Sequence, residues 1–225
     1  VQASGGVIIP PEGYLKGVHE ICRDNDILYI SDEVVTAFGR CGAWFASEAV
    51  FGITPDIVTF AKGVTSGYVP LGGIAVSDRI LREIAASGAD ATTYSNGYTY
   101  SGHAVCCAVG LKNMEVFEQE NVLEHVRDIA PYFQEKLRSL ADLEIVKDVR
   151  AIGLIGAVEC AQPGPPEIAF GDVIDRHCVE LGLIVRPIRN MCVMSPPLII
   201  SREQIDSMIG ILREGITRAW QEVVL

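Results

Sequence analysis

Residues 56–62 read DIVTFAK, an apolar run of strand length that ends in a lysine, and residues 63–67 continue as GVTSG. An ammonium group is rarely buried without a partner, so Lys62 at the buried end of a predicted strand requires an explanation. A second apolar run, ILYI at residues 27–30, leads in the same way to Asp32. A lysine and a carboxylate at the carboxyl ends of two strands predict chemistry at the rim of a parallel sheet.

The rest of the chain alternates between apolar runs of strand length and segments with helical spacing. Continuous apolar runs are typical of parallel strands covered on both faces, and their alternation with helices predicts an α/β fold. After two long predicted helices the pattern changes to short strands and a final amphipathic helix that Ser201 caps. We therefore expect an α/β unit with a mostly parallel sheet over residues 1–120 and a smaller α+β unit over residues 121–225.

Composition excludes several classes of function. The formal net charge of −11 argues against a nucleic-acid partner, which would need clustered lysines and arginines. No apolar stretch is long enough to predict a membrane-spanning helix, so we expect no membrane association. Seven cysteines without a CxxC pair and four dispersed histidines predict neither a disulfide framework nor a metal site. We expect a cytoplasmic protein with reduced cysteines.

Lys62 differs from the other lysines in its surroundings. It alone follows an apolar strand and precedes glycines, whereas the others lie in polar or amphipathic segments: Lys16, Lys112, Lys136 and Lys147. Desolvation lowers the pKa of a lysine and frees the neutral amine as a nucleophile toward an aldehyde. The alternative is a lysine at a strand end whose ammonium group reaches water.

Asp32 alone fits several roles, including a metal, ribose or pyridinium site and a simple cap of a helix or loop. Its pairing with Lys62 favours pyridoxal phosphate, because a Schiff-base lysine and an aspartate at the pyridinium nitrogen are the usual protein groups around that cofactor. A negative charge there keeps the ring nitrogen protonated, so the ring can accept electrons from the substrate carbanion.

Three loop stretches could approach a ligand. Residues 63–67 and 71–73 are rich in glycine but form no P-loop, because no Gly-Lys-Ser/Thr follows in the required frame. They allow the backbone to come close to a site, or they simply turn the chain. Residues 99–103, TYSGH, place hydroxyl groups before a predicted helix, which fits a phosphate site or an ordinary N-cap.

Three segments resemble the class III pyridoxal phosphate aminotransferases: SDEVVTAFGR at residues 31–40, PDIVTFAKG at residues 55–63 and YTYSGH at residues 98–103. The segments occur in the order and with the spacing of that family, and the resemblance runs over essentially the whole chain. It implies fold type I of the pyridoxal-phosphate-dependent transferases, with pyridoxal 5'-phosphate as the cofactor.

The resemblance also implies roles for four residues of the cofactor site. Lys62 would form the internal aldimine and then shuttle a proton between the substrate Cα and the cofactor C4′. Asp32 would pair with the pyridinium nitrogen, and Val34 would pack on the cofactor ring. Thr99 would reach the cofactor phosphate of the neighbouring subunit, which implies a homodimer with a shared active site.

Two features resemble the ω-amine:pyruvate branch of the family. Val35 is aliphatic, as is usual in that branch, where the ornithine and GABA branch has glutamine. GLIVR at residues 182–186 and MSPPL at residues 194–198 resemble the branch's C-terminal domain. Arg186 falls where a mobile arginine binds the carboxylate of the acceptor. A surface arginine at a strand end is the alternative, and Arg189 is close enough to be a rival.

The chain also departs from the family pattern. Ala104 stands where proline is usual, and Cys106 and Cys107 stand where small residues are usual. The family's full chain is about twice as long, and its N-terminal half supplies a glycine-serine loop for the phosphate and an aromatic ring stacked on the cofactor. This sequence matches only the C-terminal half, so we expect a fragment with uncovered sheet edges and apolar surface, which argues against activity by itself.

The resemblance implies transfer of an amino group from an amine or ω-amino acid to a 2-oxo acid such as pyruvate. One alternative is a pyridoxal-phosphate-dependent aminomutase of the same fold. That family usually shows TLSGN where this chain has TYSGH at residues 99–103, which counts against it. The other alternative is a non-catalytic chain, either a truncated relic or a partner subunit that another chain completes.

Overall fold

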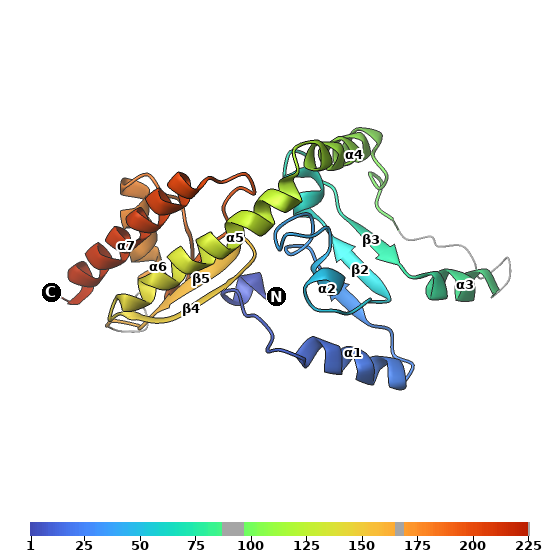
Figure 1. The fold of residues 1–225 in the computed structure, drawn as a ribbon, viewed down its shortest axis with the longest axis horizontal. Helices are drawn as coiled ribbons and strands as arrows, with labels where there is room; N and C mark the ends of the chain where they lie inside the picture. Colours follow the sequence, from blue (N-terminus) through green and yellow to red (C-terminus); the bar gives the residue numbers. More distant parts are fainter. Residues whose placement is uncertain (87–96, 165–168, 225) are drawn as a thin grey trace. The chain divides into compact units, whose positions relative to one another are not determined.

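The computed structural model describes residues 1–86, 97–164 and 169–224. The chain forms two compact units (Figure 1). One unit comprises Pro11–Leu123, and the other comprises Val1–Pro10 together with Glu124–Leu225. The sequence predicted a division into residues 1–120 and 121–225, so the difference lies mainly in the first ten residues, which pack with the C-terminal unit.

The sheet of the first unit has three described strands, β1 (Ile30–Asp32), β2 (Ile57–Phe60) and β3 (Gly73–Val76), in the order β1-β2-β3. Strands β1 and β2 are parallel, and β2 and β3 are antiparallel. The sequence predicted a mostly parallel sheet, whereas among these strands one pair is parallel and one is antiparallel. The parallel pair is the one that carries Asp32 and leads to Lys62.

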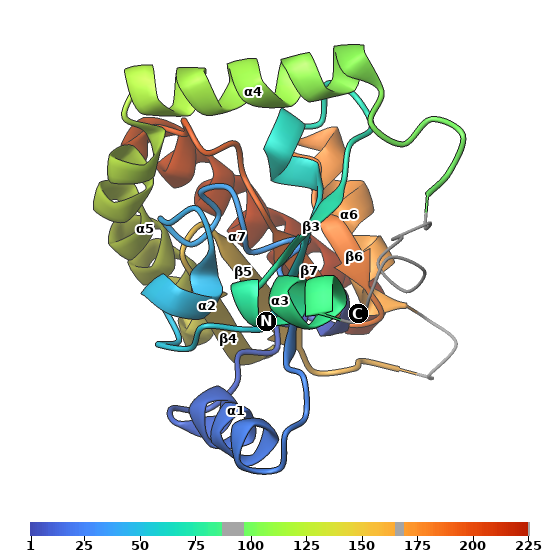
Figure 2. The same ribbon diagram turned by 90° about the vertical axis from the view of Figure 1, so that its right-hand side faces the viewer.

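The described helical elements of this unit are α1 (Tyr14–Asp24), α2 (Ala46–Ala49), the 3-10 turn η2 (Lys62–Thr65), α3 (Asp78–Ala86) and α4 (Ala104–Gln119). Helix α5 (Val122–Arg138) begins at the end of this unit and continues in the other. Figure 2 shows α4 running past η2, which it contacts.

Aromatic side chains form the core around the loop that follows β1. Phe38 is buried, and its ring packs edge-on against Phe45 and Phe60 at centroid distances of 5.8 and 5.6 Å. Trp44 stacks on Phe117 of α4. This cluster fixes the segment after β1 against β2 and α4, because closely packed aromatic rings leave little room for movement.

Part of the sheet surface of this unit is uncovered, as the sequence predicted for an incomplete sheet. Ile30 in β1 is 57% exposed and Ile74 in β3 is 49% exposed. Both belong to the outer strands of the three described here. Large exposed apolar side chains on an open sheet edge are a liability for a free monomer, because they invite pairing with another chain.

The second unit is built on an antiparallel sheet of β4 (Val146–Ile152), β5 (Ile155–Cys160), β6 (Arg186–Ile188) and β7 (Met191–Met194), in the order β4-β5-β7-β6. It also contains η1 (Ala3–Gly5), η3 (Ser139–Asp142), α6 (Phe170–Glu180) and α7 (Arg202–Val224). Fully buried side chains come from α5, α6 and α7: Phe133, Leu137, Phe170, Ile174, Leu212 and Ile216. The predicted α+β character of this region is confirmed.

Ser201 caps α7 as the sequence predicted. The backbone N–H of Gln204 donates to Ser201 Oγ at 3.3 Å, and the backbone N–H of Ser201 donates to Gln204 Oε1 at 2.9 Å. The two bonds form a reciprocal capping box, which satisfies backbone donors at the helix start.

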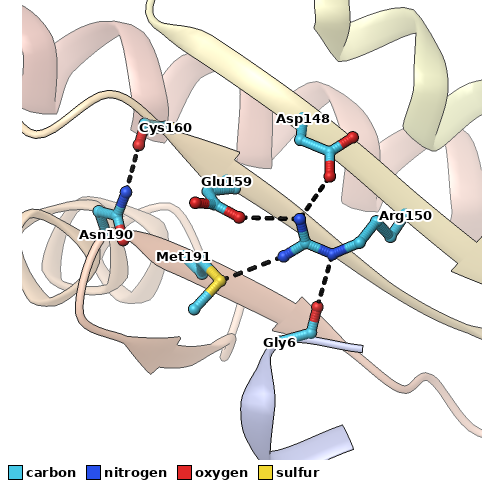
Figure 3. Close-up of polar contacts among 7 residues, drawn as sticks. All are labelled: Gly6, Asp148, Arg150, Glu159, Cys160, Asn190 and Met191. Carbon is cyan, nitrogen blue, oxygen red and sulfur yellow. Dashed lines mark hydrogen bonds and ion pairs between the residues drawn. The ribbon is translucent and has the colours of Figure 1, made fainter. Parts of the chain in front are cut away.

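Arg150 on β4 ties the first ten residues to the second unit (Figure 3). Its Nε donates to the carbonyl of Gly6 at 2.9 Å, and its Nη1 donates to Glu159 Oε2 at 2.8 Å and also to Asp148. Gly6 has a φ of +91°, and a Cβ atom there would lie 2.4 Å from the sulfur of Met191. This contact and the Arg150 bond explain why the N-terminal segment groups with the C-terminal unit.

Candidate functional site

Asp32 and Lys62 lie at the same rim of the sheet in the first unit. Asp32 is the last residue of β1 and stands opposite Thr59 of the parallel strand β2, and Lys62 follows two residues after the end of β2. The carboxyl ends of parallel strands meet at one edge, so the two side chains share the position predicted for them. Both residues are exposed in this chain, so the prediction of a buried lysine is wrong. Lys62 is exposed because even the residues of β2, the strand before it, are only partly buried.

Lys62 has an unusual backbone conformation. Its φ is +47°, in the left-handed region of backbone conformation that residues other than glycine rarely adopt. Ser66, which ends the same turn, has a φ of +50°. Two non-glycine residues in this conformation within one short turn are a sign of local strain, which tends to persist where a side chain must be held in a particular place.

Gly63 brings the turn after β2 directly against the segment after β1. A Cβ atom on Gly63 would lie 2.7 Å from Phe38 Cβ and 3.4 Å from the carbonyl oxygen of Ala37. No side chain fits in that space, so the residue after Lys62 has to be glycine. Gly63 therefore serves close packing between two loops of the protein, whereas the sequence predicted either close approach of the backbone to a site or a simple turn.

Asp32 also shapes the loop that follows it. The backbone N–H of Val34 donates to Asp32 Oδ1 at 3.0 Å, which is the local turn that aspartate side chains commonly form. Val34 is half-buried beside it. Asp32 Oδ1 therefore caps the loop, which is one of the roles that the sequence left open for this residue. The carboxylate as a whole stays exposed at the rim of the sheet.

Glu33 is a residue whose role sequence reasoning missed. Its carboxylate is only 2% exposed and accepts hydrogen bonds from the backbone N–H groups of Ala46 and Ser47, at 2.5 and 2.7 Å, and from Thr36 Oγ1 at 3.2 Å. Its own backbone N–H donates to Thr59 O at 2.9 Å. Glu33 therefore fixes the loop that begins at Asp32 to the start of α2. Helix α2 is only four residues long and its N-cap residue is Phe45, so no sequence pattern predicts this bond.

Thr99 lies in an exposed turn just before α4. The turn is closed by Ser101, whose backbone N–H donates to Tyr98 O at 2.9 Å and whose Oγ accepts from Tyr98 N at 2.8 Å. The N-cap of α4 is His103, and its side chain makes no capping bond. Residues 87–96 of the preceding loop lie outside the described residues.

Arg186 belongs to the second unit, where it begins β6 and is exposed. It lines a pocket of about 470 Å³ formed by residues 183–186 and 193–197 with Ile200, Gln204 and Met208. Arg189 is not among the lining residues. It lies in the turn between β6 and β7 with a φ of +55°, and its carbonyl accepts from Gly171 N at 2.6 Å.

The donor set of the first unit fits pyridoxal phosphate. An exposed amine (Lys62), an exposed carboxylate (Asp32) and a half-buried aliphatic side chain (Val34) all follow or end strands at one rim of the sheet. No group of three or more His, Cys, Asp or Glu in the described residues could hold a metal ion. No helix within these described ranges is long and apolar enough to cross a membrane.

The chain belongs to the class III aminotransferases, because the sequence model of that family matches residues 1–216. Two similar curated proteins are the putrescine–pyruvate aminotransferase of Pseudomonas aeruginosa, 39% identical over 220 residues, and the omega-aminotransferase of Caulobacter vibrioides, 41% identical over 215 residues. Each alignment covers 95% of this chain, but only 47% and 48% of the two relatives. The chain thus spans about half the length of the curated relatives it matches.

A solved structure also matches nearly all of this chain with about half of its own length. The amine transaminase from an uncultivated Pseudomonas species, solved in a form with bound pyridoxal phosphate, superposes with a TM-score of 0.90 at 34% identity. The match covers 96% of this chain and 50% of that chain. The fold type predicted from the sequence is therefore confirmed.

Proposed function

We propose that this chain carries the lysine-bearing half of a transaminase that uses pyridoxal phosphate to move an amino group from an amine or ω-amino acid to a 2-oxo acid such as pyruvate. The observation that carries the proposal is the placement of Lys62 and Asp32 at the ends of two adjacent parallel strands. Membership of the class III family supports the same reaction.

Each residue at the rim has a role in this proposal. The Lys62 amine would hold the cofactor through its aldehyde carbon and, once the substrate amine had released it, would carry a proton from the substrate Cα to the cofactor C4′. The Asp32 carboxylate holds the proton on the ring nitrogen, and Val34 packs on one face of the ring. When bound, pyridoxal phosphate supplies the aldehyde that accepts the amino group and a ring that delocalises the electron pair.

The assembled enzyme is proposed to be a homodimer in which Thr99 reaches the cofactor phosphate of the other subunit. The exposed position of Thr99 before the N-terminus of α4 supports this role, because backbone N–H groups there favour an anion. A cytoplasmic location is proposed from the seven cysteines, which are all free. Activity is proposed for the assembled site, since the exposed sheet residues argue against a complete site in the free chain.

Arg186 is proposed to bind the carboxylate of the 2-oxo acid. Its position on the wall of a pocket supports this choice over Arg189, which lies outside the lining. The aliphatic Val35 and the two similar relatives favour an amine or ω-amine donor. The aminomutase alternative finds no support in these relatives, whose names are those of aminotransferases.

The proposal is tested by the absorbance of the chain with added pyridoxal phosphate. We expect a band near the visible edge from the covalent cofactor linkage, and we expect Lys62→Ala to abolish it. Lys16→Ala, which removes an exposed lysine of α1, is the matched control and keeps the band. A band of equal strength in Lys62→Ala would overturn the role of this lysine.

A further inference from the structure

The turn that carries Lys62 is held from outside by one side chain of α4, that of Asn113. Its Nδ2 donates to the carbonyl of Gly63 at 3.0 Å and to the carbonyl of Val64 at 3.1 Å. Its Oδ1 accepts from Ser66 Oγ at 2.7 Å. A single half-buried amide thus bonds to three residues of a five-residue turn, from an element about fifty residues further along the chain.

This turn needs such support because its backbone is strained at both ends. Lys62 and Ser66 both have left-handed φ values, +47° and +50°. Two bonds of the turn are long, from Gly67 N to Lys62 O and from Val64 N to Ala61 O, each 3.3 Å, and a third runs from Ser66 N to Gly63 O at 3.1 Å. A strained conformation persists only where the surroundings over-determine it, and Asn113 adds bonds to these from outside the turn.

Close packing makes the contact between α4 and the turn specific. A Cβ atom on Gly110, one helical turn before Asn113, would lie 3.0 Å from Leu71 Cδ2 and 3.6 Å from the carbonyl oxygen of Val64. Thr65 is buried and donates to Val69 O at 2.7 Å. The backbone of the turn therefore lies directly against the helix face that presents Asn113.

We propose that Asn113 is a positioning residue for the Lys62 amine: by holding the Gly63 and Val64 carbonyls it keeps Lys62 in its left-handed conformation and so aims the side chain at the rim beside Asp32. This inference rests on the proposed function, in which Lys62 bonds to the cofactor aldehyde. Asn113 does not touch the reacting atoms and acts through the backbone of the turn.

The test uses the full 225-residue chain and two readouts. The first is the fraction of each lysine that becomes labelled when the chain is incubated with pyridoxal phosphate and reduced with borohydride, read by peptide mass spectrometry. The second is amide hydrogen exchange of residues 64–67, which needs no cofactor. The other four lysines serve as internal references for the labelling, which corrects for differences in reagent and in protein concentration.

Three variants separate the bonds. Asn113→Ala removes all three, Asn113→Asp keeps the acceptor for Ser66 but removes both donors, and Ser66→Ala removes only the bond to Ser66. Asn25→Ala is the matched control, because Asn25 Nδ2 also donates to a backbone carbonyl, that of Ile21 at 2.9 Å, but at the exposed end of α1.

We expect Asn113→Ala and Asn113→Asp to lower the Lys62 label about tenfold relative to the other lysines and to speed exchange in the turn about tenfold, with a smaller effect of Ser66→Ala. Asn25→Ala leaves both readouts unchanged. Faster exchange without a loss of Lys62 label would show a purely structural tie and overturn the inference, as would no change in either readout. A wild-type chain whose Lys62 is labelled no more than its other lysines would instead contradict the proposed function.

Discussion

Gly63 and Phe38 touch so closely that a Cβ atom on Gly63 would lie 2.7 Å from Phe38 Cβ. Gly63 follows Lys62, and Phe38 lies in the loop that begins at Asp32, so this contact joins the two halves of the candidate site. We expect Gly63→Ala to lower the free energy of unfolding of the first unit by about 1–3 kcal/mol, because the added methyl group overpacks the contact. Urea denaturation measures the change.

Gly17→Ala is the control for that substitution. Gly17 lies within α1, and nothing stands within 4 Å of a Cβ atom added there, so alanine fits and favours the helix. Equal stability of Gly63→Ala and Gly17→Ala would contradict the close contact between the two loops.

Glu33→Gln should destabilise the first unit by about 2–3 kcal/mol, since hydrogen bonds to a buried charged group are stronger than neutral ones. Glutamine keeps the shape, but one of its two acceptor positions becomes a donor that faces the N–H groups of Ala46 and Ser47. Glu48→Gln, an exposed carboxyl in the same helix, is the control and should change stability by less than about 0.5 kcal/mol. A smaller loss in Glu33→Gln than in Glu48→Gln would rule out Glu33 as the support of this loop.

The second unit should lose stability in alkaline solution. Burial, with the Glu159 carboxylate nearby, raises the pKa of the Cys160 thiol to about 12 from an ordinary value of 9.0. The folded thiol therefore stays protonated where the unfolded one ionises, so its contribution to stability is fully present below pH 9 and falls between pH 9 and pH 12. The expected slope is about 1.4 kcal/mol per pH unit for this one group.

Cys160→Ala isolates that contribution. At pH 7 the variant reports only the lost packing, and between pH 9 and pH 11 its free energy of unfolding should fall less steeply than that of the wild type. Equal slopes for the two proteins would show that Cys160 is ionised as readily in the folded state as in the unfolded state.

Arg150→Lys should release the first ten residues from the second unit. Lysine keeps the charge beside Glu159 but lacks the guanidinium fork that reaches Gly6 O and Glu159 at the same time. Limited proteolysis followed by mass spectrometry should show cleavage within residues 1–10 several-fold faster than in the wild type. Arg218→Lys, which alters an exposed pair with Glu214 on α7, should leave the rate unchanged.

Pyruvate binding distinguishes the two candidate arginines. Because Arg186 lines the pocket of the second unit and Arg189 does not, Arg186→Leu should weaken pyruvate binding about tenfold or more in calorimetric titration, and Arg189→Leu should not. The reverse order would assign the carboxylate to Arg189.

The positions of Asp32 and Lys62 could be predicted from the sequence, because each residue follows an apolar run of strand length. The apolar runs before Asp32 and Lys62 correctly indicated two neighbouring parallel strands and the side of the sheet where they end. The antiparallel pairing of β3 could not be predicted, because a short apolar run does not reveal the direction of its partner.

The supporting residues were harder to predict because their partners are distant in the sequence. Glu33 bonds to Ala46, thirteen residues away, and Asn113 bonds to Gly63, fifty residues away. Neither contact leaves a periodic pattern, and both residue types are common on protein surfaces. The left-handed backbone of Lys62 could not be predicted either, because residues other than glycine rarely adopt it.

The central claim is that Lys62 is the lysine that bonds to pyridoxal phosphate at a rim shared with Asp32. The most direct measurement is the mass-spectrometric location of the cofactor after borohydride reduction, in the wild type and in Asp32→Asn. We predict that the wild type carries the label mainly on Lys62 and that Asp32→Asn keeps the label there but shifts the absorbance of the bound ring. A label spread evenly over Lys16, Lys62, Lys112, Lys136 and Lys147 would contradict the claim.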